Sequence, residues 1–183
     1  VPFFNIALKT DRRALIPRDE TALLTELAVS LIRQKDYRTL LDLGTGSGAI
    51  ALACKFNVPA LAVCAADISS DALALAEENA RELNLGVELK QSDCFSALDG
   101  RTFDCILSNP PYIAQADLEK LERELSFEPQ NALDGGPDGL DFYRIIIAQA
   151  ADHLNAGGML MFEMGAGQRE TIEYLLLKAG FSD

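Results

Sequence analysis

The sequence predicts an α/β fold in which a doubly wound parallel sheet follows a short N-terminal β-hairpin. Short apolar runs alternate with longer stretches whose apolar residues recur at helical spacing, from residue 39 onward. Strands that alternate with helices in this way form parallel sheets with helices on both faces. Polar or glycine-rich turns follow the first four predicted strands. Because ligands of such sheets bind at the carboxyl ends of the strands, these four turns predict one site on one rim.

Length and composition predict one globular domain. The chain has 183 residues, of which 49% are hydrophobic, and its mean hydropathy is +0.08. A chain of this size buries roughly 70% of its unfolded surface, which is enough for a core. The longest apolar runs are too short to span a membrane, and residues 1–10 lack the layout of a signal peptide. We therefore expect a cytoplasmic protein without a membrane partner.

The cysteine, histidine and charge content disfavours several kinds of catalytic and binding site. The four cysteines show no C-x-x-C spacing, and three lie in or beside apolar runs, so we expect core thiols. The single histidine, His153, is expected on a helix, at the surface or half-buried. These residues predict neither a metal site nor a Ser-His or Cys-His catalytic pair. The net charge of −12 disfavours stable nucleic-acid binding and favours a protein or small-molecule partner.

The N-terminal residues predict a hairpin and then a helix. Residues 3–16 are expected to form the hairpin, with its turn near residues 9–12, because Phe4, Ile6 and Leu8 alternate at strand period. A helix is expected over residues 19–34, where apolar side chains form a stripe at helical spacing.

The rest of the chain alternates strands with helices. Apolar runs predict strands, and amphipathic stretches predict helices. The expected strands are 39–43, 61–66, 87–91, 103–108 and 159–163, and the expected helices are 48–55, 71–83, 115–124, 140–154 and 165–179. Residues 127–139 are expected to form an irregular loop of the kind that carries binding.

The first strand runs directly into Gly44-Thr-Gly-Ser-Gly48. Glycines at a strand-to-helix turn let the backbone approach a ligand closely, and the helix N-terminus offers free N–H groups. The G-x-G-x-G spacing departs from the G-x-G-x-x-G dinucleotide fingerprint, so alone it is equally consistent with a tight turn. Asp67 ends the second strand 19 residues after Gly48. A carboxylate there can accept hydrogen bonds from both ribose hydroxyls, so the pair predicts a nucleoside-containing cofactor.

Asp93, Cys94 and Phe95 follow the third strand. A carboxylate beside an aromatic suits an adenine, because the carboxylate can accept from the exocyclic amino group while the ring packs on the base. A turn with one buried phenylalanine is an equal alternative.

Asn109-Pro110-Pro111-Tyr112 follows the fourth strand. Both prolines lack an N–H, and a residue before proline is pushed out of the helical region, so the chain leaves the strand extended and stiff. The Asn109 side-chain oxygen and the Pro110 carbonyl can then converge on a planar NH2 group, with Tyr112 as a flat wall beside it. An ordinary Pro-Pro turn is the alternative.

With these motifs the chain resembles the release-factor glutamine N5-methyltransferases, which are S-adenosylmethionine enzymes with a Rossmann-like, class I methyltransferase sheet. The glycine loop is general to class I methyltransferases, and Asn-Pro-Pro-Tyr is shared with amino-group methyltransferases that act on adenine. The first and last of the matching stretches are more specific. The resemblance extends over nearly the whole chain, and its matching stretches are 15–18, 42–50, 109–113, 127–129 with 132–133, and 135–141.

The resemblance implies a role for each motif. Residues 19–183 would form the S-adenosylmethionine-binding methyltransferase domain, after an N-terminal hairpin and lead-in segment in residues 1–18. The substrate would be the glutamine of the Gly-Gly-Gln loop in a peptide chain release factor. The implied substrate-binding residues are Asn109, Pro110, Pro111 and Tyr112, of which Asn109, Pro110 and Tyr112 would be catalytic. The implied cofactor-binding residues are Asp42, Gly44, Thr45, Gly46, Ser47, Gly48, Asp67, Ile68, Asp93, Cys94, Phe95 and Asn109.

The chain also departs from the family pattern. The usual Pro-Glu-Thr-Glu is Asp19-Glu-Thr-Ala22 here, and Cys94 stands where a large aromatic is common, so adenine packing is expected on Phe95. The family has a helical domain before the hairpin and a final strand pair after Phe181. Neither is present in this sequence, so we expect a trimmed catalytic domain.

The implied reaction needs no histidine base. Two acceptors, the Asn109 side chain and the Pro110 carbonyl, would hold the amide hydrogens and aim the nitrogen at the sulfonium methyl group. Three alternatives stay open: an N6-adenine methyltransferase acting on nucleic acid, a glutamine methyltransferase for a ribosomal protein, and an inactive cofactor-binding fragment.

Overall fold

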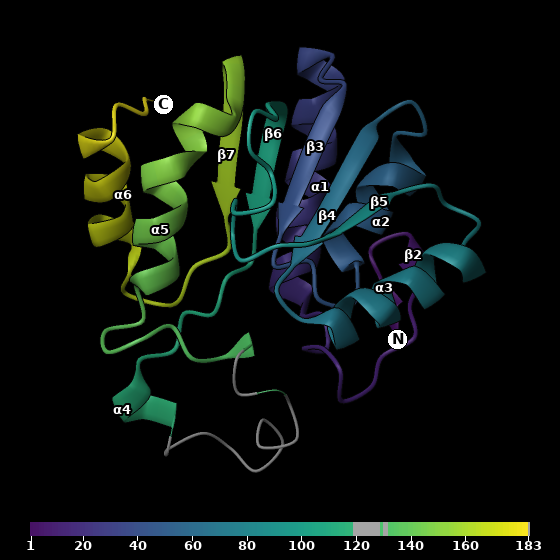
Figure 1. The fold of residues 1–183 in the computed structure, drawn as a ribbon, viewed down its shortest axis with the longest axis horizontal. Helices are drawn as coiled ribbons and strands as arrows, with labels where there is room; N and C mark the ends of the chain where they lie inside the picture. The colour runs from purple at the N-terminus through teal and green to yellow at the C-terminus, as the bar shows by residue number, and fades with distance from the viewer. Residues whose placement is uncertain (119–128, 130–131, 183) are drawn as a thin grey trace.

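A five-stranded parallel sheet forms the centre of the protein, in a computed structural model that describes residues 1–118, 129 and 132–182. The strand order is β5-β4-β3-β6-β7, so the first central strand lies in the middle of the sheet (Figure 1). The strands are β3 Thr39–Leu43, β4 Ala62–Asp67, β5 Glu88–Gln91, β6 Phe103–Ser108 and β7 Leu154–Phe162. The predicted α/β fold with a parallel sheet is confirmed.

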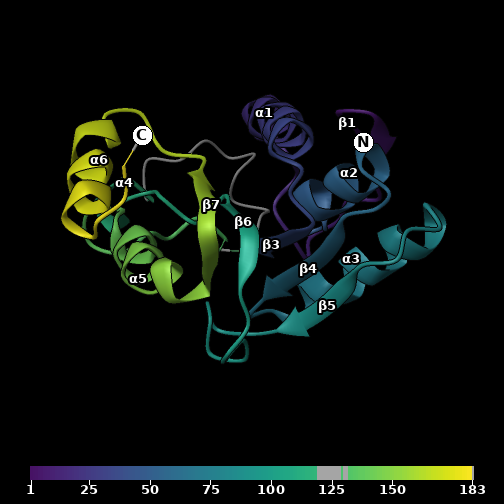
Figure 2. The ribbon, with the colours of Figure 1, turned by 90° about the horizontal axis from the view of Figure 1, so that it is seen from above.

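Helices cover both faces of the sheet, as Figure 2 shows from above. Side chains alternate across a strand, so Leu40 of β3 packs with α1 and α2 while its neighbour Leu41 packs with α5. The α6 helix packs on the outer side of α5 through Tyr143 and Ile172. The helices are α1 Asp19–Lys35, α2 Ala49–Asn57, α3 Ser70–Glu82, α4 Gln115–Leu118, α5 Asp141–Ala150 and α6 Arg169–Lys178.

The N-terminal hairpin is shorter than the sequence predicts, and its turn lies elsewhere. Its strands are β1 Pro2–Phe3 and β2 Ile6–Ala7, and Phe4 in the turn has a φ of 45°. The predicted turn near residues 9–12 is therefore wrong. Because the turn follows Phe3, the alternation of inward and outward side chains is interrupted there. Phe3, Ile6 and Leu8 are therefore the residues buried against α2 and α3.

The C-terminal elements also differ from their predicted bounds. The β7 strand begins at Leu154, five residues early, and a register irregularity between Phe103 and Cys105 accommodates the two glycines expected to form a turn. The helix before it ends at Ala150 and continues as a 3₁₀ turn over Ala151–His153. His153 is buried, not at the surface or half-buried as predicted, because its ring stacks on Phe95. The last helix starts at Arg169, after a turn over residues 165–168.

Some predicted segments lie outside the described residues. Of the predicted charged helix over residues 115–124, the structure describes Gln115–Leu118. Of the predicted loop over residues 127–139, it describes 129 and 132–139. Among the described residues, no helix is both long and apolar enough to cross a lipid bilayer.

Candidate active site

A cavity of about 500 Å³ opens at the carboxyl ends of the strands. The structure thus brings four separate sequence motifs to one place. The predicted site residues that line the cavity are Gly44, Thr45, Gly46 and Ser47 after β3, Asp67 and Ile68 at β4, Asp93 and Cys94 after β5, and Asn109, Pro110 and Pro111 after β6.

The glycine loop wraps one end of the cavity. Gly44, Gly46 and Gly48 have φ values of 71°, 56° and 83°, which L side chains rarely adopt. The N–H groups of Gly44 and Thr45 both donate to the carbonyl oxygen of Ala66, at 2.8 and 3.0 Å. Gly48 does not line the cavity and is the N-cap of α2. The loop is therefore tied to the next strand while its inner surface faces the cavity.

Asp67 links the ends of two strands. Its Oδ2 accepts from the N–H of Gly46 at 2.9 Å, and its Oδ1 accepts from the N–H of Ser69 at 2.9 Å. Burial raises the pKa of its carboxyl group, against the effect of these hydrogen bonds. The cap of α3 is Ser69, whose hydroxyl accepts from the N–H of Ala72. Asp67 is therefore a cavity carboxylate that also fixes the glycine loop.

Asp42 supports the loop from beneath and does not line the cavity. It is 1% exposed, and its Oδ2 accepts from the Thr45 hydroxyl at 2.6 Å and from the Ala51 N–H at 3.1 Å. Burial raises the pKa of its carboxyl group to about 7. Oδ1 of Asp42 has no hydrogen-bond partner among the described residues, and the cofactor contact expected at Asp42 stays a prediction.

Phe95 does not face the cavity, which corrects the expectation that it packs on an adenine. It is 1% exposed, and its ring stacks on His153 at a centroid distance of 4.4 Å and an interplanar angle of 10°. The neighbouring Cys94 lines the cavity with a φ of 46°. The apolar lining comes instead from Ile68 and from side chains of α5, including Ile145.

Three residues of the Asn-Pro-Pro-Tyr turn line the cavity, and the fourth, Tyr112, packs outside the lining. The three are Asn109, Pro110 and Pro111, and the flat wall expected at Tyr112 stays a prediction. Burial raises the pKa of the Tyr112 hydroxyl, and the carboxylates of Glu163 and Glu20 add to the rise. Its backbone carbonyl accepts from Nε2 of Gln168 at 2.9 Å.

The described part of the predicted loop holds this turn from behind. The N–H of Ile113 donates to the carbonyl of Leu133, and the N–H of Gly135 donates back to the carbonyl of Ile113, at 3.0 and 2.9 Å. Gly139 has a φ of 75°, and an added Cβ there would collide with the carbonyl oxygen of Tyr112. The glycines of this loop are therefore needed for close backbone packing against the turn.

Two residues of the site, Thr21 and Glu163, were missed by sequence reasoning. The Thr21 hydroxyl donates to Oε2 of Glu163 at 2.6 Å, and Nδ2 of Asn109 donates to the Thr21 oxygen at 3.1 Å. Burial and the nearby Glu20 charge raise the pKa of Glu163, against hydrogen bonds from Thr21, Asn109 and Tyr112. A signal was available for Glu163, since it follows the fifth strand on the same rim as the four predicted turns.

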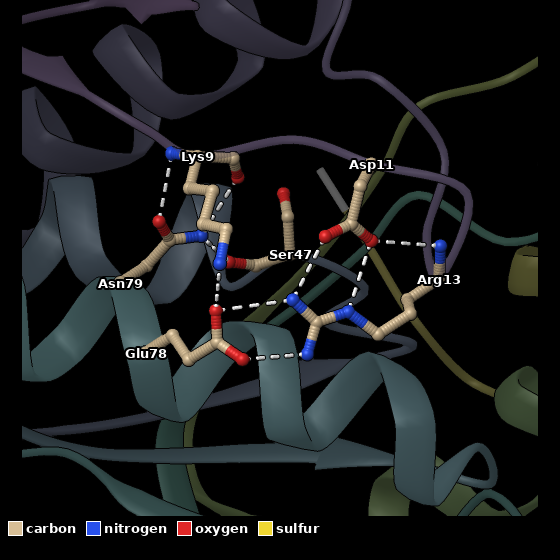
Figure 3. A network of polar contacts seen from close by, with 6 residues as sticks. All are labelled: Lys9, Asp11, Arg13, Ser47, Glu78 and Asn79. Carbon is tan, nitrogen blue, oxygen red and sulfur yellow. Dashed lines mark hydrogen bonds and ion pairs between the residues drawn. The ribbon is translucent and has the colours of Figure 1, made fainter.

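The lead-in segment is tied to α3, and Asn79 of that helix also bonds Ser47 of the glycine loop, as Figure 3 shows. Asn79 is 1% exposed, and its side chain bonds both backbone groups of Lys9 and the carbonyl of Ser47. Arg13 bridges Asp11 and Glu78, and the hydrogen bonds from Arg13 lower the pKa of each carboxyl group to about 2. This network places Arg13 and the following residues on the cavity lining.

Comparison with known proteins gives a family match and named relatives. Residues 18–139 match the family model of the methyltransferase small domain. A release factor glutamine methyltransferase from Geobacter sulfurreducens is 45% identical over 170 residues, which cover 92% of this chain and 59% of the relative. A ribosomal protein uL3 glutamine methyltransferase from Xylella fastidiosa is 41% identical over 94% of this chain and 56% of the relative. The chain spans about three fifths of the length of the curated relatives it matches.

Solved structures share the fold. A ribosomal protein L11 methylase from Lactobacillus delbrueckii subsp. bulgaricus superposes with a TM-score of 0.64 at 27% identity, covering 90% of this chain and 71% of that chain. The T. thermophilus 16S rRNA N2 G1207 methyltransferase, solved in complex with AdoMet and guanosine, has a TM-score of 0.64 at 20% identity, covering 90% and 38%.

Proposed function

We propose a function from one premise, which is that the chain belongs to the methyltransferase small domain family. The chain transfers the methyl group of S-adenosylmethionine to the side-chain amide nitrogen of a protein glutamine, and its substrate is the Gly-Gly-Gln loop of a peptide chain release factor. The observation that carries the proposal is the position of Asn109 and Pro110 on the lining of the same cavity as the glycine loop and Asp67. Named relatives at 39–45% identity support the choice of substrate.

The cavity residues fit this cofactor. A volume of about 500 Å³ lies within the range of small-molecule sites. The positive-φ glycines allow close approach of the methionine part, and the half-buried Asp67 carboxylate suits ribose hydroxyls. Ile68 and Ile145 offer apolar surface for a base, with the carboxylate of Asp93 on the same lining. S-adenosylmethionine, when bound, supplies a methyl group on a positively charged sulfur.

The residues of the turn prepare the acceptor nitrogen. An amide nitrogen is a poor nucleophile because its lone pair is delocalised into the carbonyl group. Oδ1 of Asn109 and the carbonyl oxygen of Pro110 accept its two N–H hydrogens and so orient the nitrogen. The same two acceptors stabilise positive charge that grows on nitrogen during transfer, which is binding of the transition state. The new C–N bond would form as the bond between the methyl group and sulfur breaks, with its electron pair left on sulfur, and the surplus proton on nitrogen would leave to water.

A second substrate has one specific observation in its favour. The Xylella fastidiosa relative named for ribosomal protein uL3 is 41% identical over 94% of this chain, and its name specifies the same glutamine methylation. The charge of −12 weighs against DNA or RNA as a direct substrate, because the negative charges of the protein and of the nucleic acid repel each other.

A methyl-transfer assay with labelled cofactor tests the proposal. Parallel reactions contain a release factor, the same factor with alanine in place of the loop glutamine, ribosomal protein uL3, or DNA and RNA. The expected result is label on the Gly-Gly-Gln glutamine by peptide mapping and none on the alanine form. Label on uL3 alone would move the substrate to the second candidate. Label on nucleic acid would overturn the proposed chemistry.

A further inference from the structure

We propose that Thr21 and Glu163 are positioning residues that hold the Asn109 side-chain amide in the one orientation able to accept from a substrate NH2 group. This inference rests on the proposed function, because it concerns how the acceptor in that site is set. Asn109 itself contacts the substrate, whereas Thr21 and Glu163 act through Asn109.

The direction of the hydrogen bonds follows from the chemistry of the groups. An ionised carboxylate only accepts, so the Thr21 hydroxyl must use its one hydrogen to donate to Oε2 of Glu163, at 2.6 Å. The Thr21 oxygen then has lone pairs left to accept, and it takes a hydrogen of Nδ2 of Asn109 at 3.1 Å. The amide nitrogen of Asn109 is thereby directed into the protein, and Oδ1 is the atom available to a guest.

The shape of the pocket alone could not set this orientation. The oxygen and the NH2 group of an asparagine are nearly equal in size, so a flip by 180° changes little in packing but exchanges an acceptor for a donor. In the flipped state, an NH2 donor would meet the NH2 donor of the substrate glutamine. Only a hydrogen-bond partner of fixed polarity distinguishes the two states, and the Thr21–Glu163 pair provides that polarity.

The hydrogen-bonded chain from Glu163 through Thr21 to Asn109, here called the relay, is anchored on three elements of the fold. Thr21 lies in the first turn of α1 and is 4% exposed. The N–H of Glu163 donates to the carbonyl of Ser108, the residue before Asn109, at 3.1 Å. The Tyr143 hydroxyl donates to the carbonyl of Glu163 at 2.9 Å. Donor and acceptor of the relay are therefore fixed relative to the strand that carries Asn109.

The activity test compares threonine-to-valine substitutions at two positions of the same helix, together with a serine variant at the first. Thr21→Val keeps the shape but removes the hydroxyl, and Thr21→Ser keeps the hydroxyl. Thr25→Val is the matched control, since Thr25 is fully buried one turn later and its hydroxyl bonds the carbonyl of residue 21 within the helix. We expect Thr21→Val to lower kcat roughly 10- to 100-fold while the Kd for S-adenosylmethionine stays within about twofold. Thr21→Ser should restore most of kcat, and Thr25→Val should leave kcat near that of the wild type.

Two results of this assay would overturn the inference. One is a kcat for Thr21→Val within about threefold of the wild-type value. The other is an equal loss of kcat in Thr21→Val and Thr21→Ser, because packing rather than the hydroxyl would then explain the effect.

A second readout needs no methyl transfer, and so separates failure of this inference from failure of the proposed function. In ¹⁵N-labelled protein, the side-chain NH2 signals of Asn109 are assigned by their loss in Asn109→Ala. We expect Thr21→Val to move these signals, and Thr21→Ser and Thr25→Val to leave them near their wild-type positions. Unmoved Asn109 signals in Thr21→Val would refute the relay even in an active enzyme. Moved signals in a protein that methylates no glutamine would support the relay while refuting the proposed function.

Discussion

The carboxylate of Asp67 accepts a hydrogen bond from the backbone N–H of Gly46 at 2.9 Å, so the end of one strand holds the loop that follows its neighbour. Asp67→Asn removes the charge from a cavity group that we expect to bind the ribose. Hydrogen bonds to charged groups contribute about 1.5–3 kcal/mol, so the Kd for S-adenosylmethionine should rise roughly 10- to 100-fold. Isothermal titration calorimetry measures it, with the exposed Asp71→Asn as control. Equal affinities of Asp67→Asn and wild type would exclude this role.

Asn109→Ala should separate binding of the cofactor from catalysis. The substitution removes an acceptor for the substrate amide but leaves the glycine loop and Asp67 in place. Methyl transfer to the substrate glutamine should fall at least about 100-fold, since both orientation and charge stabilisation are lost. The Kd for S-adenosylmethionine should change by less than about threefold, since no charged contact is removed. Wild-type turnover in this variant would rule out the mechanism.

Gly139→Ala should disturb the Asn-Pro-Pro-Tyr turn from behind. The added Cβ collides with the carbonyl oxygen of Tyr112, and the φ of 75° at this position strains any L side chain. We expect a loss of stability of about 1–3 kcal/mol in chemical denaturation, together with reduced kcat. Gly100→Ala is the control, because its φ of 70° carries similar strain while its Cβ would meet open space. Equal kcat values in the two variants would show that contact with the turn does not matter.

Asp42→Asn should change how stability depends on pH. Burial raises the pKa of Asp42 to about 7 in the folded protein, above its ordinary value of 3.8. The folded state therefore binds more protons than the unfolded state between these pH values, and this group destabilises the fold increasingly as pH rises from about 4 to about 7. At about 1.4 kcal/mol per unit of pKa, the effect is of the order of 4 kcal/mol.

The asparagine variant lacks this proton uptake, so its stability relative to wild type should increase between pH 5 and pH 8. Urea unfolding at several pH values measures the difference, and the exposed Asp99→Asn provides the control. A difference between variant and wild type that is constant with pH would contradict the raised pKa of Asp42.

Phe95→Leu should lower stability without changing cofactor affinity, and Ile68→Ala should do the reverse. Phe95 is 1% exposed and packed on His153, so its truncation should cost about 1–2 kcal/mol in urea unfolding with little change in the Kd for S-adenosylmethionine. Ile68 is 57% exposed and lines the cavity, so its truncation should weaken cofactor binding and leave stability nearly unchanged. A large affinity loss in Phe95→Leu alone would return the adenine contact to Phe95.

The three inner strands β3, β4 and β6 were predictable because they are mostly buried and read as apolar runs. The bounds of β3 and β6 match the prediction residue for residue. Irregular backbone was harder to predict. Phe4 adopts a positive φ in the hairpin turn, and β7 passes through Gly157 and Gly158, both contrary to the usual local preferences of these residues.

The site was predictable where a motif ends a strand and not where a role depends on distant contacts. Gly44–Ser47, Asp67 and Asn109 follow their strands and reach the same cavity. Phe95 stands beside Cys94 in sequence, but the chain turns at Cys94, and the Phe95 ring is buried in the core against His153. Glu163 gains its significance through contacts with Thr21, Asn109 and Tyr112, which no local sequence pattern indicates.

The bond between Thr21 and Glu163 spans 142 positions of the chain, which has a consequence for the timing of synthesis. Contacts between distant residues form late, because the entropy of loop closure must be overcome first. A nascent chain that has not yet exposed Glu163 can already present the glycine loop and the Asn-Pro-Pro-Tyr turn, but not the partner that sets Asn109. On the proposed function, a chain synthesised only as far as residue 162 therefore lacks the carboxylate that is proposed to orient Asn109.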